Sequence, residues 1–122
     1  MQINLNTNNQ SFGSIKLCAG AEDALRKALK PNDWVAFDKI AQAQKNNSVD
    51  INLFGRNDGG KLIGRIIPNK DNFKIEEHNQ LPFFEPTIKF IDKLAKKADT
   101  IAEKIKELPA VNIDEIISKL KQ

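Results

Sequence analysis

One histidine, one cysteine and no tyrosine leave this sequence few side chains for acid–base or nucleophilic chemistry. A single histidine excludes a zinc site built on paired imidazoles, and a single cysteine excludes a C-x-x-C arrangement. Nucleophilic catalysis would require His78 to meet Cys18 or a serine in space. His78 lies in a charged run with Glu76 and Glu77, and we expect it at the surface. Cys18 is expected to be a small buried residue of a strand.

Phosphate, calcium and carboxylate chemistry have no clear motif. Gly59-Gly60-Lys61 lacks the upstream glycine spacing of a phosphate-binding loop and the Ser or Thr after the lysine. The 56–60 turn lacks the acidic ladder of a calcium loop. Four carboxylates could still form a hydrolytic pair, but no spacing selects them: Asp38, Asp50, Asp58 and Glu85. We therefore predict no catalytic, metal-binding or cofactor-binding residue and no enzymatic activity.

The longest apolar pattern is a stripe along one predicted helix. Its members follow the 3-4-3-4-3 spacing of heptad core positions: Ile91, Leu94, Ala98, Ile101, Ile105 and Leu108. The stripe either packs on the protein's own sheet, as amphipathic helices usually do, or contacts a partner helix, most simply from a second copy. A second apolar face follows at Ile113, Ile116, Ile117 and Leu120. So many apolar side chains exceed what a small sheet is expected to cover, which favours a partner.

Two adjacent aromatic residues, Phe83 and Phe84, lie between Pro82 and Pro86. Two prolines within five residues exclude a helix here, so we expect an extended connector. Neighbouring side chains on an extended segment point in opposite directions. One phenylalanine is therefore expected to anchor the connector to the core, and the other to contact a partner, because aromatic residues are enriched at interfaces.

Basic side chains gather around a predicted hairpin turn at 55–60. They form, with one amide, a candidate contact set for nucleic acid: Arg56, Asn57, Lys61 and Arg65. Two helices followed by a hairpin with a basic tip is also the element order of a winged helix. Against this, the second helix would present Asp33 and Asp38 to DNA, and strands precede the helices. A solvated turn is the simpler interpretation.

Hydrophobic periodicity predicts an α+β fold. Alternating apolar residues indicate strands at 3–5, 15–17, 49–53, 61–67 and 73–77. Helical spacing and start signals indicate helices at 21–30, 33–45 and 86–108, and a last short helix from Asn112. The predicted order is ββ-αα-βββ-αα. Because strands and helices segregate, we expect an antiparallel sheet, made of an N-terminal hairpin and a three-stranded meander, with two central helices and a C-terminal helical pair.

The composition is that of an ordinary globular domain. Hydrophobic residues make up 40% of the chain and charged residues 29%, and the net charge of +3 permits nucleic acid without arguing for it. A chain of this length predicts one domain, residues 1–122, with 86–122 as a possible association element. No apolar run approaches the ~18 residues of a membrane span. The polar N-terminus does not resemble a signal peptide, so we expect a cytoplasmic protein without a membrane partner.

These observations favour a non-enzymatic protein–protein interaction module, such as an adaptor, inhibitor or assembly factor. Self-association through the C-terminal helices is one form it could take, and the identity of any other protein partner is open. The alternative is a nucleic-acid-binding protein that uses the 55–65 hairpin and lysine-rich helix surfaces.

Overall fold

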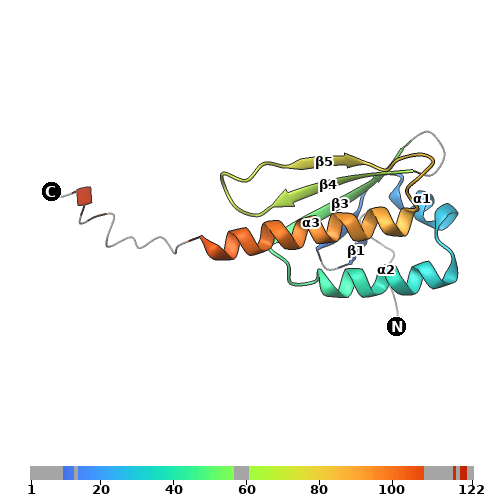
Figure 1. Cartoon of the computed structure of the whole chain (residues 1–122), viewed down its shortest axis with the longest axis horizontal. Coiled ribbons are helices and arrows are strands. Elements are labelled where there is room, and N and C mark those ends of the chain that lie inside the picture. The colour runs from blue at the N-terminus through green and yellow to red at the C-terminus, as the bar shows by residue number, and fades with distance from the viewer. Residues whose placement is uncertain (1–9, 13, 57–60, 109–116, 118, 121–122) are drawn as a thin grey trace.

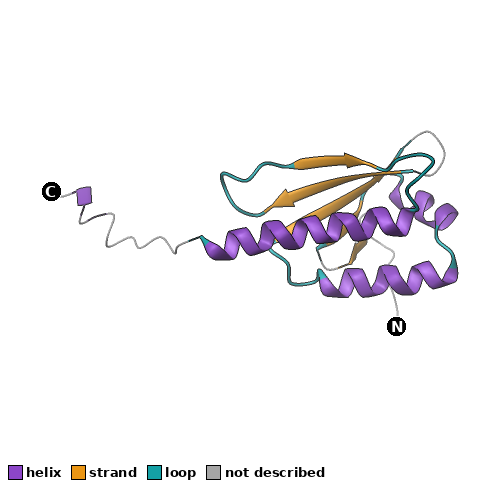
Figure 2. Cartoon of the chain, viewed as in Figure 1, coloured by secondary structure: helices purple, strands orange, loops and turns teal. Residues whose placement is uncertain are grey.

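The chain folds into two layers, a mixed β-sheet and a layer of helices, in a computed structural model (Figures 1 and 2). The structure describes residues 10–12, 14–56, 61–108, 117 and 119–120. Its elements are, in order, β1 (Gln10–Phe12), β2 (Ile15–Leu17), α1 (Ala21–Ala28), α2 (Pro31–Ala43), β3 (Val49–Gly55), β4 (Leu62–Pro68), β5 (Glu76–Asn79) and α3 (Thr87–Glu107). The fold is α+β, as predicted from the sequence.

The sheet is mixed, so the prediction of a purely antiparallel sheet is wrong. Its five strands lie in chain order, β1-β2-β3-β4-β5. Three neighbouring pairs are antiparallel, but β2 and β3 are parallel, with Ile15 beside Ile51 and Leu17 beside Leu53. A parallel pair needs a long crossover, because the chain must return to the end of the sheet from which it started. Here α1 and α2 provide that crossover together.

The predicted C-terminal helical pair is also wrong for the residues that the structure describes, where α3 is the one helix after β5. The second helix was expected from Asn112, and most of that segment, 109–116 and 118, lies outside the described residues. The predicted first strand, 3–5, lies outside them as well. The structure describes a strand that was not predicted, β1 at Gln10–Phe12. The N-terminal hairpin therefore pairs β1 with β2.

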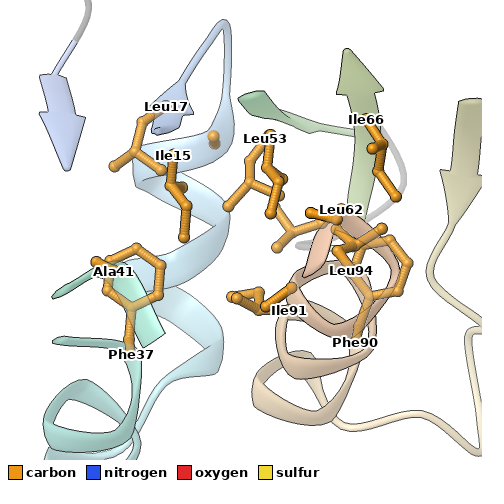
Figure 3. Close-up of a cluster of buried hydrophobic side chains, with 14 of the residues drawn as sticks. Ile15, Leu17, Phe37, Ala41, Leu53, Leu62, Ile66, Phe90, Ile91 and Leu94 are labelled. Carbon is orange, nitrogen blue, oxygen red and sulfur yellow. The ribbon is translucent and has the colours of Figure 1, made fainter. Parts of the chain in front are cut away.

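The core lies between the helices and one face of the sheet (Figure 3). Along β3 the buried residues alternate with half-buried ones, so that Val49, Ile51 and Leu53 all point towards the helices. In Figure 3, Phe90, Ile91 and Leu94 of α3 and Phe37 of α2 lie close to strand side chains that include Ile15, Leu53 and Leu62. All three helices contribute buried residues to the same cluster, which makes them one layer on one side of the sheet. The other face of the sheet carries none of the described helices.

Local signals explain where the two central helices begin. Pro31 is the first residue of α2, a position where its missing N–H costs nothing. Asp33 accepts a hydrogen bond from the backbone N–H of Lys30 at 3.1 Å, so Asp33 caps this helix start from within the first turn. Before α1, Gly20 has a positive φ of 77° and packs closely against Gly55 at the end of β3. A Cβ on Gly55 would lie 2.2 Å from the carbonyl oxygen of Gly20, so this crossing requires glycine.

Candidate interaction surface

The heptad stripe of α3 is mostly buried inside the protein. Ile91 and Leu94 have no exposed surface and Ile101 is 9% exposed, because all three pack against the chain's own sheet and helices. Ile105 is partly buried against the same core. This corresponds to the first of the two interpretations of the stripe, an amphipathic helix that covers its own sheet. These four side chains do not form a free surface.

The end of the stripe differs from its beginning. Leu108 is 44% exposed, Ile117 is 43% exposed and Leu120 is 80% exposed. Ile113 and Ile116, the other two members of the predicted C-terminal interface, lie outside the described residues.

A different apolar group, in the connector between β5 and α3, is fully presented to solvent. Phe83 and Phe84 are each 87% exposed, and Leu81 is 55% exposed. The expectation that one phenylalanine anchors the connector fails, because residues 82–84 form a turn and are not extended. Both rings project into solvent. We call Leu81–Phe84 the aromatic turn.

Gln80, which is 1% exposed, holds the first end of the aromatic turn. Its side-chain Oε1 accepts a hydrogen bond from the backbone N–H of Leu62 at 3.0 Å. Its Nε2 donates to the carbonyl oxygen of Glu85 at 2.8 Å and to Thr87 Oγ1 at 3.0 Å. One buried amide thus ties together the start of β4, the far end of the turn and the first residue of α3. Such a fully paired buried amide rigidifies its surroundings.

Glu85 fastens the other end of the aromatic turn. Its Oε1 accepts a hydrogen bond from the backbone N–H of Leu81 at 3.1 Å, which closes the turn. Its Oε2 forms a salt bridge of 2.6 Å with Lys93 Nζ on α3, and only 13% of the Glu85 side chain is exposed. Burial raises the pKa of Glu85, but the hydrogen bonds from Lys93 and Leu81 and the Lys93 charge outweigh burial and leave the pKa below its ordinary value.

The basic residues predicted to contact nucleic acid are largely engaged with the protein itself. Arg56 donates from a guanidinium nitrogen to the carbonyl oxygen of Gln80 at 3.2 Å. Arg65 forms a salt bridge of 2.8 Å with Glu77 and lies 4.9 Å from the centre of the Phe54 ring. Lys61 is half-buried, and Asn57 lies outside the described residues. The structure brings Arg56 close to the aromatic turn rather than into a basic patch with Arg65.

The structure places the one histidine on β5 and the one cysteine directly after β2. His78 is 26% exposed at its side chain, and its Nε2 lies 3.0 Å from Glu76 Oε1 on the same face of β5. Cys18 is partly buried rather than fully buried. Among the described residues no group of His, Cys, Asp or Glu side chains could hold a metal ion. The described helices also include none that is both long and apolar enough to cross a membrane.

Sequence reasoning missed Gln80, which organises the aromatic turn. A buried glutamine is rare, since its amide must find several partners. Those partners come from β4, from the connector and from α3. The sequence carries no local signal for such a meeting. Glu85 was considered only as one of four carboxylates without a selected role.

A comparison of the chain with protein-family models, with curated proteins and with solved structures found no match. The class of the protein therefore follows from its own geometry: a two-layer α+β domain whose described helices cover one face of the sheet and whose exposed aromatic turn is hydrogen-bonded at both ends.

Proposed function

We propose that this protein is a protein–protein interaction module and that the aromatic turn, Leu81–Phe84, inserts into an apolar pocket of another protein. The single observation that carries this proposal is the exposure of two neighbouring phenylalanines, each at 87%, on a turn that is fastened at both ends. An adaptor, an inhibitor or an assembly factor would each need such a surface.

The energetics of the turn support a binding role. Transfer of one phenylalanine side chain from water into an apolar pocket is favourable by roughly 1.5–3 kcal/mol. Both rings face water in the lone chain, so this free energy is available for binding. Aromatic side chains are also frequent among the few residues that dominate binding energy at interfaces. Because Gln80 and Glu85 already hold the backbone of the turn, little further ordering is needed on binding.

The charges beside the turn indicate the chemistry of the partner. Lys93 forms a salt bridge with Glu85 at the end of the aromatic turn. Lys89, four residues earlier on α3, is exposed. Lys89, Lys93, Lys96 and Lys97 line one shallow hollow on α3 together with Asp92 and Thr100. We infer that the partner's pocket is apolar at its centre and acidic at the rim next to α3. Opposite charges at the rim increase the rate of association more than the final affinity.

Nucleic-acid binding by the 55–65 hairpin remains a separate proposal with less support. Arg56 and Arg65 each have intramolecular partners, which phosphate contacts would have to displace. A cytoplasmic setting belongs to the main proposal and is supported by the presence of only one cysteine, which leaves no internal disulfide.

A photo-crosslinking residue placed at Phe84 tests the main proposal directly. We expect the full chain, expressed in its native cells, to give a discrete protein–protein product from this position. The matched control places the same residue at Ile75, which is 61% exposed and lies outside the turn. Phe83→Ala should reduce the product from position 84 without changing the thermal unfolding of the chain. Absence of a product, a product from both positions, or cross-links to lipid would each contradict the proposal.

A further inference from the structure

The open face of the sheet carries a row of polar side chains that crosses four strands. Lys16 on β2 pairs in register with Asn52 on β3, Asn52 with Arg65 on β4, and Arg65 with Glu77 on β5. Residues paired in register share a face of the sheet. This face is opposite to the one that packs against the helices, because the neighbouring positions along β3 and β4 are the buried ones.

Together with Asp50, the row carries as many acidic as basic side chains. Lys16 and Arg65 are balanced on the open face by Glu77 and by Asp50, which lies one pleat away on β3. Arg65 is already held between Glu77 and the Phe54 ring. A surface that binds phosphates concentrates positive charge, so this neutral face is poorly suited to nucleic acid. Separated charges of both signs suit a protein surface with the complementary pattern.

We propose that the open face packs against the same face of a second copy of this chain. The two-fold axis would run along the strands, midway between β3 and β4. Lys16 and Glu77 lie at equal distances on either side of this line, since one is on β2 and the other on β5. The two-fold operation therefore places Lys16 of each copy opposite Glu77 of the other. An interface of this kind repeats each favourable contact twice.

The same axis matches the remaining side chains of the row. Arg65 of each copy lies opposite Asn52 of the other. The Oδ1 atom of Asn52 is shielded from solvent and accepts no hydrogen bond among the residues that the structure describes. In the dimer the Arg65 guanidinium of the second copy lies next to this oxygen, while its Nε keeps its hydrogen bond to Glu77. An unpaired carbonyl oxygen next to a strong donor gains a hydrogen bond that the lone chain does not provide.

Apolar contacts accompany the polar row. Phe54 and Ile63 are register partners on either side of the axis and are both half-buried. The two-fold operation places Phe54 of one copy over Ile63 of the other. Two sheets packed face to face lie ~10 Å apart, a distance that such side chains fill. At the end of the face, the same operation places Asp50 of one copy over Ile67 of the other, and Asp50 accepts a hydrogen bond from Asn69 at 3.5 Å within its own chain.

The expected dimer is weak, because the face is small. β3 and β4 have seven residues each, so the face measures roughly 20 Å along the strands and roughly 20 Å across them. Two such faces bury roughly 800 Å² in total, which is below the size of stable specific interfaces and in the range of weak, transient ones. Self-association should therefore appear at micromolar concentrations and weaken with salt, which screens the Lys16–Glu77 contacts.

Sedimentation velocity of the full chain tests the dimer between about 5 µM and about 500 µM, the range that covers a weak interface. We expect a concentration-dependent shift from the monomer mass to twice that mass. Lys16→Glu and Glu77→Lys should each raise the dissociation constant at least tenfold, since both place like charges opposite each other twice. An equimolar mixture of the two variants should recover the dimer, because Glu at position 16 of one then faces Lys at position 77 of the other.

Two controls separate this proposal from the others. Lys89→Glu makes the same charge change at an exposed position of α3, in the helix layer on the opposite side of the sheet, and should leave the dimer unchanged. Phe83→Ala with Phe84→Ala should also leave it unchanged, so that failure of the aromatic turn as a binding site and failure of this dimer are distinguishable. A monomer at every concentration, a dimer unaffected by Lys16→Glu, or a mixture that stays monomeric would overturn the proposal.

Discussion

The stripe on α3 and the aromatic turn have similar apolar character in the sequence but opposite positions in the fold. Leu94 and Ile91 are fully enclosed, whereas Phe83 and Phe84 are 87% exposed a few residues upstream. Leu94 is enclosed because Gly64 leaves room for it: a Cβ on Gly64 would lie 2.3 Å from Leu94 Cδ1. The aromatic turn is exposed because the hydrogen bonds of Gln80 and Glu85 hold it away from the core. Apolar character alone therefore does not separate the buried residues of this chain from the exposed ones; the neighbouring polar groups also decide.

The largest expected effect lies on the buried side of this comparison. Leu94→Ala should lower the free energy of unfolding by about 3 kcal/mol, because it leaves a cavity above Gly64. Phe84→Ala should change it by less than about 0.5 kcal/mol, as exposed substitutions usually do. Urea denaturation followed by circular dichroism measures both. Equal losses for the two variants would show that the turn is part of the core after all.

An intermediate effect is expected from Gln80→Met, which keeps the shape of the side chain and removes its polar atoms. The backbone N–H of Leu62 would lose its buried acceptor, at a cost of about 1–3 kcal/mol. The carbonyl oxygen of Glu85 would also lose the hydrogen bond that the Gln80 side chain donates to it. The backbone amides of residues 81–85 should therefore exchange hydrogen faster than in the parent chain. Hydrogen exchange read by mass spectrometry reports this directly. Unchanged exchange in the turn would mean that other contacts hold it.

The smallest effect is expected from Glu85→Gln, which removes the charge that faces Lys93. The loss should be below about 1 kcal/mol, because Lys93 is 43% exposed. The pKa of Glu85 is depressed below its ordinary value of 4.5 in the folded chain. The ionised Glu85 therefore stabilises the fold above pH 4.5, and this contribution is lost as the pH falls through its lower pKa in the folded chain.

Urea titrations of the parent chain and of Glu85→Gln should accordingly differ at neutral pH and converge in acid. Asp92→Asn is the matched control, since its bridge to Lys96 is exposed on both sides and follows an i,i+4 spacing. A difference between parent and Glu85→Gln that persists unchanged in acid would show that the carboxylate charge is not what fastens the turn.

Much of the fold could be predicted because its signals are local. The meander β3-β4-β5 was predicted from alternating residues and turn residues, and its antiparallel pairing is confirmed. The third strand was placed too early, near Phe73 and Ile75, because β5 consists of polar and charged residues without alternation. Sheet edges tolerate such sequences, and β5 pairs with one neighbour only.

The rest depends on contacts between distant parts of the chain. Nothing near β2 indicates that it runs parallel to β3, because the direction is set by the path of α1 and α2 between them. The candidate site shows the same limit. Phe83 and Phe84 were identified from their type and their flanking prolines, but their joint exposure depends on Gln80, whose partners come from three separate segments.

The parallel pairing of β2 with β3 affects the rate at which this chain folds. Ile15 and Ile51 are separated in the chain by two helices, so pairing β2 with β3 costs more chain entropy than closing any of the hairpins. Contacts between distant residues slow the folding of small domains. The meander and the hairpin are thus expected to assemble early, and the joining of β2 to β3 to set the overall refolding rate.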